Sequence, residues 1–280
     1  MEEATEEEEL FRQLSLATYN VSGKTVQLWV CESFRGTIIE KEAGFDLTGF
    51  VIWPAARMFV AFLETQSEIL RGRRVIEFGS GVGLGGLAVS AVGATVLLTE
   101  CEPRVLRVLR KNSDLAATQG SEVATAELLW GDTQHLEALE TEHPRVVPAD
   151  VALGCDIVYP NMPREAVVAL FASVRRLVRH EGKLILAYIP RTPDTDLLLA
   201  EVSLAEGFQW TSCVSDVTFD SPVRLGGFVI EFTPIEHESD PPAAGSAPWL
   251  VMPPSPTSSE DWEPPAQGGL FDTDPEDEDP

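Results

Sequence analysis

The sequence has few of the residues that build metal and redox sites. It contains four cysteines and four histidines, all widely separated, and no Cys-x-x-Cys pair. We therefore expect reduced thiols in an intracellular protein, with neither a disulfide framework nor a metal site. The apolar runs are too short to cross a membrane, and the acidic first residues are unlike a signal or transit peptide.

Positive charge is also scarce. Lys and Arg number 20 against 45 Asp and Glu, which gives a formal net charge of −25. Nucleic acids and anionic membranes are bound through clusters of Lys and Arg, so the composition argues against both partners. An acidic surface instead favours a protein partner with a basic face, attracted over long range. We expect the chain itself to be a monomer.

Composition divides the chain into three parts. Residues 1–9 hold six acids and no base, and we expect a disordered tail there. Residues 10–233 have the composition of one folded domain, with an N-terminal hairpin region at 25–50 and a core at 51–233. Residues 234–280 hold twelve acids, no Lys or Arg and eleven of the twenty prolines. This segment is expected to be a second disordered tail, whose few apolar residues, such as Trp249, are either stray or short docking motifs.

The folded part alternates between strand and helix patterns. Short continuous apolar runs predict strands buried on both faces of a parallel sheet, at 73–78, 94–99, 123–128, 150–154 and 183–188. Between and after them, helices are expected at 83–92, 103–117, 163–179 and 193–205, with an earlier one from Pro54 to about 63. Residues 210–219 and 224–232 resemble a terminal antiparallel pair, and 26–30 with 37–39 an N-terminal hairpin. The succession predicts a doubly wound α/β sheet with ligands at the carboxyl ends of its strands.

A glycine-rich turn follows the first of these strands. Gly79, Ser80 and Gly81 come directly after an apolar run that contains Glu77, and the next strand ends in Glu100. Glycines let the backbone approach a ligand closely, and the acid after the second strand can accept hydrogen bonds from both hydroxyls of a ribose.

The two acids decide which nucleoside cofactor suits this turn. Carboxylates at Glu77 and Glu100 would repel the pyrophosphate of a dinucleotide. S-adenosylmethionine carries a sulfonium, an amino group and a free ribose, and it suits two nearby acids. A nicotinamide cofactor and a turn without a ligand are the less favoured alternatives.

Other candidate residues follow the later strands. Trp130 follows the third strand, where an indole can stack on an adenine ring. Asp156 and Tyr159 follow the fourth strand, and Trp53 precedes the helix that leads into the sheet. Each also has a structural interpretation: the aromatic residues can belong to the core, and Asp156 can cap a turn.

Taken together, these motifs resemble one family. The stretches are W-P-A-A at 53–56, E-F-G-S-G-V-G at 77–83, T-E at 99–100, L-W-G at 129–131 and D-I-V-Y at 156–159. They look like the seven-β-strand methyltransferase family 16, the methyltransferase-like 21 type of protein-lysine methyltransferases. The resemblance covers about residues 25–233. It implies a class I, Rossmann-like, S-adenosylmethionine-dependent methyltransferase sheet with a small N-terminal β-hairpin extension. It also implies a lysine in an intracellular protein, such as a translation factor or chaperone, as acceptor, in the cytoplasm with the nucleus as a second compartment.

The resemblance implies a role for each site residue. Asp156 would face the incoming amine and Tyr159 would close the pocket, both next to the reaction. The cofactor would contact Trp53 at its methionine end, Gly79, Ser80 and Gly81 beneath it, Glu100 at the ribose, Trp130 at the adenine, and also Glu77, Cys155 and Tyr159. The family's Tyr-Glu-x-Arg element reads Tyr188-Ile189-Pro190-Arg191 here, so its Glu is absent and a different substrate or weaker activity is expected.

Two other functions compete with lysine methylation. A methyltransferase with an arginine, histidine or small-molecule acceptor shares the same cofactor motifs. The absence of an N-P-P element after the fourth strand argues against amide and adenine-amino acceptors. A non-enzymatic adaptor with a methyltransferase fold is the second alternative.

Overall fold

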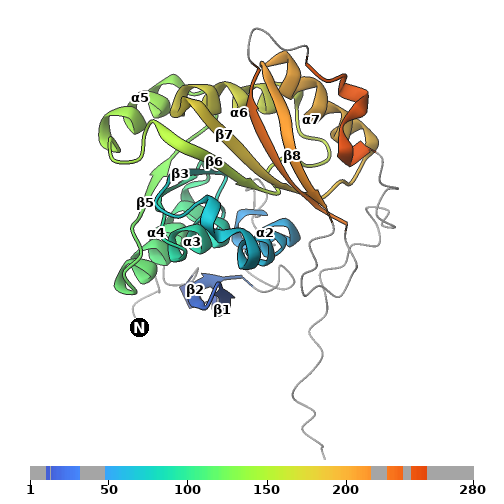
Figure 1. Ribbon diagram of the computed structural model, residues 1–280. Helices are drawn as coiled ribbons and strands as arrows, with labels where there is room; N and C mark the ends of the chain where they lie inside the picture. Colours follow the sequence, from blue (N-terminus) through green and yellow to red (C-terminus); the bar gives the residue numbers. More distant parts are fainter. Residues whose placement is uncertain (1–10, 13, 32–47, 216–225, 236–240, 251–280) are drawn as a thin grey trace, which may run out of the picture.

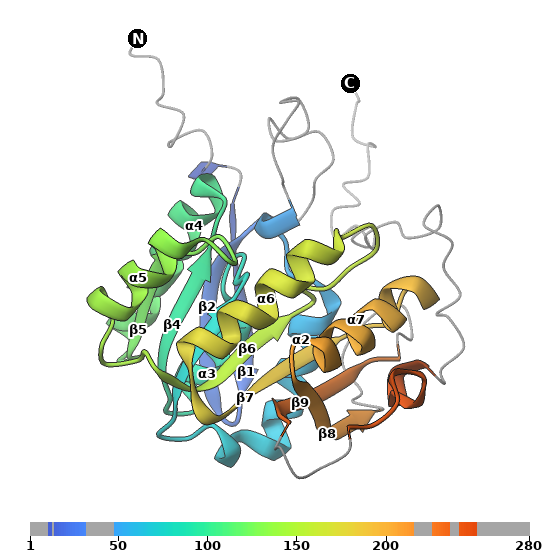
Figure 2. The ribbon, with the colours of Figure 1, turned by 90° about the horizontal axis from the view of Figure 1, so that it is seen from above.

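One seven-stranded sheet organises the computed structural model, which describes residues 11–12, 14–31, 48–215, 226–235 and 241–250. Helices cover both faces of this sheet (Figures 1 and 2). One face carries α2 (Pro54–Gln66), α3 (Leu84–Ala91) and α4 (Pro103–Thr118). The other face carries α5 (Thr133–Glu142), α6 (Arg164–Leu177) and α7 (Pro193–Ala205).

The strand order within the sheet is β5-β4-β3-β6-β7-β9-β8. β3, β4, β5, β6 and β7 pair in parallel, and β9 and β8 continue the sheet as antiparallel strands. The doubly wound α/β fold is therefore confirmed. The chain leaves β3 toward β4 and later returns to its other side as β6, so the sheet has a topological switch point between these two strands, where such folds bind ligands. The bounds are β3 (Arg74–Phe78), β4 (Thr95–Glu100), β5 (Val123–Glu127), β6 (Ala149–Cys155), β7 (Val178–Tyr188), β8 (Phe208–Ser215) and β9 (Phe228–Pro234).

The central strands are apolar throughout because both of their faces are covered. In β3, Val75 packs into the core under α2, α3 and α4, and the next residue, Ile76, packs into the core under α5, α6 and α7. Neighbouring strands continue the two faces in register, since Val75 lies opposite Val96 of β4 and Val151 of β6. Successive side chains that point to opposite faces of the sheet and are all buried are typical of a parallel sheet between two helical layers.

An N-terminal hairpin packs beneath α3 and α4, and it is displaced from the expected position. It joins β1 (Ser15–Val21) to β2 (Lys24–Val30). The strand expected at 26–30 therefore forms, but its partner precedes it in the chain; residues 37–39, the expected partner, lie outside the described residues. The buried side chain of Asn112 in α4 joins this hairpin to the core, because it hydrogen-bonds the backbone N–H and carbonyl of Trp29 (2.6 and 2.9 Å) and the carbonyl of Val82 (2.8 Å).

Helix α5 was not among the expected helices. Asp132 caps its N-terminus by accepting a hydrogen bond from the backbone N–H of His135 at 2.9 Å. Only Leu136 and Leu139 are buried along it, so the helix has a very narrow apolar face. An Asp four residues before the first residue of a weak apolar repeat is the signal that could have indicated this helix.

The expected start of the C-terminal tail at residue 234 needs correction. Residues 241–250 form two short 3-10 helices, η4 (Ala244–Ser246) and η5 (Pro248–Leu250). Trp249 is fully buried there, within 5.2 Å of the Trp210 ring and 5.9 Å of the Phe232 ring, measured between centroids. The described fold therefore continues to residue 250, and Trp249 belongs to the core rather than to a solvated tail.

Among all the residues that the structure describes, no helix reaches the length and apolarity needed to cross a membrane. In the same part of the chain, no group of three His, Cys, Asp or Glu side chains could hold a metal ion. Cys101 and Cys155 are free thiols.

Candidate active site

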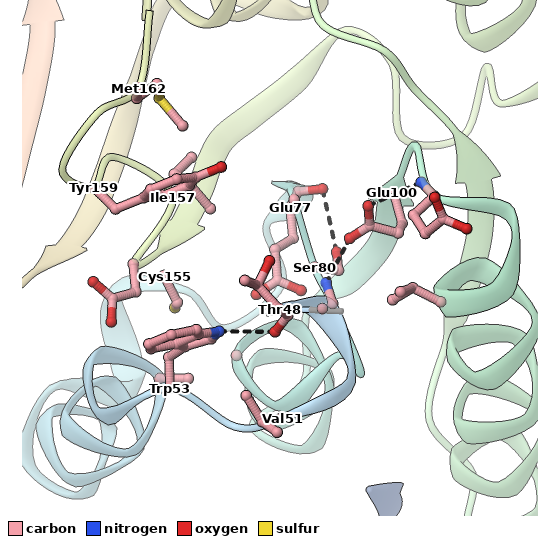
Figure 3. Close-up of a pocket in the computed structure, with 18 of the residues that line it drawn as sticks. Thr48, Val51, Trp53, Glu77, Ser80, Glu100, Cys155, Ile157, Tyr159 and Met162 are labelled. Atoms are coloured by element: carbon pink, nitrogen blue, oxygen red, sulfur yellow. Dashed lines mark hydrogen bonds between the residues drawn. The ribbon is translucent and has the colours of Figure 1, made fainter. Parts of the chain in front are cut away.

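A cavity of ≈ 910 Å³ opens at the carboxyl ends of β3, β4 and β6. This volume is at the upper end of the range for pockets that bind small molecules and cofactors. Figure 3 shows Trp53 and Tyr159 from two different segments at one end of the cavity, with Ser80 and Glu100 toward the other. All of the site residues expected from the sequence line this one cavity: Trp53, Glu77, Gly79, Ser80, Gly81, Glu100, Trp130, Cys155, Asp156 and Tyr159.

The glycine turn forms the floor of the cavity in a conformation that requires glycine. Gly79 and Gly81 have φ of +59° and +55°, in the left-handed region. A Cβ atom at Gly81 would lie 2.9 Å from the carbonyl oxygen of Gly49, and one at Gly79 would lie 3.4 Å from the Trp130 ring. Ser80 fixes the turn to β4, because its N–H donates to the carbonyl of Thr99 at 2.8 Å and its hydroxyl accepts from the Thr99 N–H at 3.1 Å.

Glu77 is a buried acid under the first turns of α3. Its Oε1 accepts a hydrogen bond from the backbone N–H of Gly86 at 3.0 Å, while its Oε2 has no partner. Burial raises the pKa of Glu77 to about 8; the hydrogen bond from the Gly86 N–H opposes this rise, and the charge of Glu100 adds to it. A buried carboxyl with an unpaired oxygen beside a cavity is suited to a ligand that brings a donor or a positive charge.

Glu100 lies at the end of β4, and its carboxylate organises the backbone around the cavity. Oε2 accepts from the N–H of Gly81 at 2.9 Å, and Oε1 accepts from the N–H groups of Cys101 (2.8 Å) and Glu102 (3.2 Å). A carboxylate has about four acceptor positions, so a further one remains for a ligand hydroxyl. This geometry suits the ribose contact that the sequence predicts.

Three aromatic residues lie around the cavity. Trp130 is half-buried and lies against the glycine turn, as expected for a residue that covers a flat ring. The indole N–H of Trp53 donates to the carbonyl of Thr48 at 2.8 Å, which fixes its ring in the wall (Figure 3). Tyr159 is 41% exposed on the loop after β6, so it lies at the mouth.

Asp156 has a partner that the sequence did not reveal. It adopts φ of +62°, and its side chain is 1% exposed. Both carboxylate oxygens accept hydrogen bonds from the guanidinium of Arg191, at 2.7 and 2.5 Å. The guanidinium carbon lies 5.7 Å from the centre of the Trp53 ring. Burial lowers the pKa of Arg191, but the charge of Asp156 outweighs it and keeps the guanidinium positive.

The remaining predicted residue, Cys155, is the last residue of β6. Burial and the charges of Glu77 and Asp156 raise the pKa of its thiol well above the ordinary value, so it stays protonated. A Cβ atom at Gly85 would lie 2.9 Å from its sulfur, which shows how closely α3 packs on this strand. The thiol is therefore protonated and closely packed, and Cys155 lines the cavity at the end of β6.

A doubly wound sheet with a glycine turn after its central strand and an acid at the end of the next strand is typical of enzymes that bind a nucleoside cofactor, class I methyltransferases among them. The lysine methyltransferase family model matches residues 35–202, more than half of the chain. The chain therefore belongs to the lysine methyltransferase family, and its cofactor is S-adenosyl-L-methionine.

Curated relatives agree with this family. The protein N-lysine methyltransferase METTL21A of Danio rerio is 33% identical over 173 residues, which are 61% of this chain and 72% of the relative. The calmodulin-lysine N-methyltransferase of Arabidopsis thaliana is 33% identical over 116 residues, 40% of this chain and 38% of the relative. The EEF1A lysine methyltransferase 3 of Mus musculus is 31% identical over 140 residues, 49% of this chain and 53% of the relative. The chain thus spans about half or less of the length of the last two.

Among solved structures, the magnesium protoporphyrin IX methyltransferase of Synechocystis PCC 6803 with bound SAH matches 62% of this chain and 80% of its own, with a TM-score of 0.46 and 14% identity.

The residues around the cavity fit S-adenosylmethionine. The glycine turn forms a cradle that side chains at Gly79 or Gly81 would fill. The unpaired Oε2 of Glu77 can accept from an amino group, and Glu100 can accept from one ribose hydroxyl. Trp130 supplies an aromatic face beside the turn.

Proposed function

We propose that the chain transfers a methyl group to a lysine side chain of a protein, with the Asp156–Arg191 pair and Tyr159 at the reacting end of the cavity. The observation that carries this proposal is the pairing of a buried carboxylate and guanidinium beside Trp53, in the same cavity as the glycine turn and Glu100. Such a cavity can hold a nucleoside and an incoming side chain together.

The cofactor half of the proposal assigns one contact to each residue. Glu100 binds the ribose, Trp130 covers the adenine, and Gly79, Ser80 and Gly81 pass beneath the ligand. Trp53 and Glu77 contact the methionine end, and the backbone of Cys155 and the ring of Tyr159 complete the wall. When bound, S-adenosylmethionine supplies a methyl group on a sulfonium, and positioning of the amine in line with it gives most of the acceleration.

The ion pair resolves a difficulty about the lysine. A lysine amine must be neutral to react, although its ordinary pKa is near 10.4. An unpaired Asp156 would stabilise the ammonium and raise that pKa further. Because Arg191 already balances the charge of Asp156, the carboxylate can accept one hydrogen bond from the amine without strongly favouring its protonated form. Asp156 then orients the amine, and Tyr159 at the mouth contacts its stem or its nitrogen.

A protein acceptor with a basic face fits the charge of the chain. Lys and Arg are outnumbered by more than two to one, so a basic partner is attracted and a nucleic acid is repelled. The relatives are named for lysine methylation of proteins, including calmodulin and EEF1A, and these names support a protein acceptor. We further propose that the chain acts as a monomer in the cytoplasm, with the nucleus as a second compartment.

The test compares the full-length wild type with Asp156→Asn, which keeps the size of the side chain and removes its charge. Binding of S-adenosylhomocysteine is measured by calorimetry, and transfer of tritiated methyl groups into a cell lysate is measured with the labelled lysine identified by mass spectrometry. We expect unchanged binding and a loss of transfer of about a hundredfold or more, the usual size of a catalytic contribution.

The matched control is Asp194→Asn, an exposed acid in the first turn of α7. It should bind and transfer like the wild type. Label on arginine or histidine, or binding without any transfer by the wild type, would contradict the proposed function. Full transfer by Asp156→Asn would contradict the role of Asp156 alone.

A further inference from the structure

A second buried acid lies behind the Asp156–Arg191 pair. Asp196, in the first turn of α7, is only 7% exposed. One of its carboxylate oxygens accepts a hydrogen bond from the hydroxyl of Tyr188, the last residue of β7. Burial raises the pKa of Asp196, while the Tyr188 hydroxyl and the backbone N–H and charge of Arg191 oppose that rise. Asp196 therefore contacts Tyr188, at the end of β7, and Arg191, in the short connection from β7 to α7.

The same residue is held from its other side by the C-terminal segment. The indole N–H of Trp249 donates to the carbonyl oxygen of Asp196 at 3.0 Å. Trp249 is fully buried against Trp210 and Phe232, and its 3-10 helix lies along α7 (Figures 1 and 2). This contact fixes the first turn of α7 relative to β8 and β9.

Arg191 belongs to the connection that Asp196 holds. Residues 189–192 join β7 to α7, and Ile189 is buried, so the segment has little freedom at its start. The direction of the Arg191 side chain, and so its two-atom contact with Asp156, depends on where this connection lies. A displacement of about 1 Å at a reacting centre can lower a rate a hundredfold.

We propose that Asp196 is a positioning residue for methyl transfer: it fixes the β7–α7 connection so that Arg191 meets Asp156, and Trp249 anchors Asp196 from the C-terminal segment 241–250. This inference rests on the proposed function of the Asp156–Arg191 pair. The C-terminal segment is then part of the active-site framework although none of its residues lines the cavity.

The test uses full-length variants that each remove one hydrogen bond and keep most of the packing. Tyr188→Phe removes the hydroxyl that Asp196 accepts from, and Trp249→Phe removes the indole N–H. We expect methyl transfer into a cell lysate to fall about tenfold for Tyr188→Phe and about threefold for Trp249→Phe, the range for loss of one buried hydrogen bond. In both variants, the affinity for S-adenosylhomocysteine and the apparent KM for S-adenosylmethionine should stay unchanged. The control, Asp194→Asn, should keep the wild-type transfer rate, affinity and KM.

A positioning role also predicts that the effects are not additive. In an Arg191→Ala background, Tyr188→Phe should cause no further loss, because the side chain through which it acts is gone. A loss by the same factor in both backgrounds would show a general structural role and overturn the inference, as would wild-type rates in both variants.

Hydrogen exchange gives a readout that needs no transfer. Backbone amides of residues 188–189 and 191–192 should exchange faster in Tyr188→Phe and Trp249→Phe than in the wild type and in Asp194→Asn. Unchanged exchange would overturn the inference by itself. A wild type that binds S-adenosylhomocysteine but transfers nothing would contradict the proposed function, and the exchange result would still decide the role of Asp196.

Discussion

The carboxylate of Glu100 accepts a hydrogen bond from the backbone N–H of Gly81, so the acid that ends β4 also holds the glycine turn after β3. The two sequence motifs that indicate the cofactor are therefore one structural unit. A change at either residue should disturb the same ligand, and the fold offers a matched control for each.

Glu100→Ala should weaken S-adenosylhomocysteine binding by about ten- to a hundredfold, because both the ribose contact and the support of Gly81 are lost. Calorimetry measures the change. Glu127→Ala is the control: it is exposed and lies opposite Glu100 in register on β5, outside the cavity. Equal losses in the two variants would mean that general negative charge, rather than the Glu100 contact, holds the ligand.

Gly81→Ala should reduce both stability and cofactor affinity. Its Cβ atom would lie 2.9 Å from the Gly49 carbonyl, in a left-handed conformation. Gly120→Ala has the same kind of conformation, φ of +85°, but no atom within 4 Å of its Cβ. Each should lose about 1–2 kcal/mol from the left-handed backbone, and Gly81→Ala should lose more. Chemical denaturation measures stability, and only Gly81→Ala should bind S-adenosylhomocysteine more weakly, by about tenfold or more.

Glu77 should make the free energy of unfolding depend on pH. Its pKa is near 4.5 in the unfolded chain and about 8 in the fold, so the folded state holds one more proton between these values. The stabilisation is complete below pH 4.5 and is lost as pH rises toward 8, with a slope of up to about 1.4 kcal/mol per pH unit.

The check is denaturation of the wild type and Glu77→Gln at several pH values. Glu77→Gln keeps an acceptor for the Gly86 N–H and removes the titration. The difference between the two proteins should grow in favour of the variant as pH rises from 5 to 8. Parallel curves would show that Glu77 keeps an ordinary pKa.

Salt should slow methyl transfer without changing cofactor binding. The chain is strongly acidic, and attraction of a basic protein acceptor is screened as ionic strength rises. Transfer into a lysate should fall several-fold between about 0.05 and 0.5 M salt, where the screening length shortens to a few ångströms. Constant transfer would indicate an acceptor recognised without long-range charge, while a parallel loss of S-adenosylhomocysteine affinity would place the salt effect at the cofactor.

The sheet and the cofactor turn could be predicted because their signals are local. A parallel strand buried on both faces is a continuous apolar run, and glycines at fixed spacing indicate the turn after β3. The weakly amphipathic α5 and the partner strand of β2 gave no comparable signal. Trp249 could not be placed either, because its burial depends on Trp210 and Phe232, whose positions are set by the fold rather than by neighbouring sequence.

The residues that the sequence singled out line one cavity, but the sequence did not indicate which of them pair. Asp156 follows β6 and Arg191 follows β7, and only the parallel pairing of these strands brings the two side chains together. The same holds for Asp196, which meets Tyr188 because α7 turns back over the end of β7. Charge pairs between separate elements can be predicted only when the fold is known, whereas a backbone turn can be predicted from neighbouring residues.

Asn112 makes the N-terminal hairpin and the cofactor turn sensitive to the exchange of a single atom. Its amide oxygen accepts from Trp29, while its amide nitrogen donates to the carbonyls of Trp29 and Val82, so both halves of the amide are in use. Aspartate has the same shape, but it would turn a carboxylate oxygen toward two carbonyl oxygens in a buried place. The most similar residue in size is thus one of the least tolerable replacements, and hydrolysis of this one amide group would loosen the hairpin and the glycine turn together.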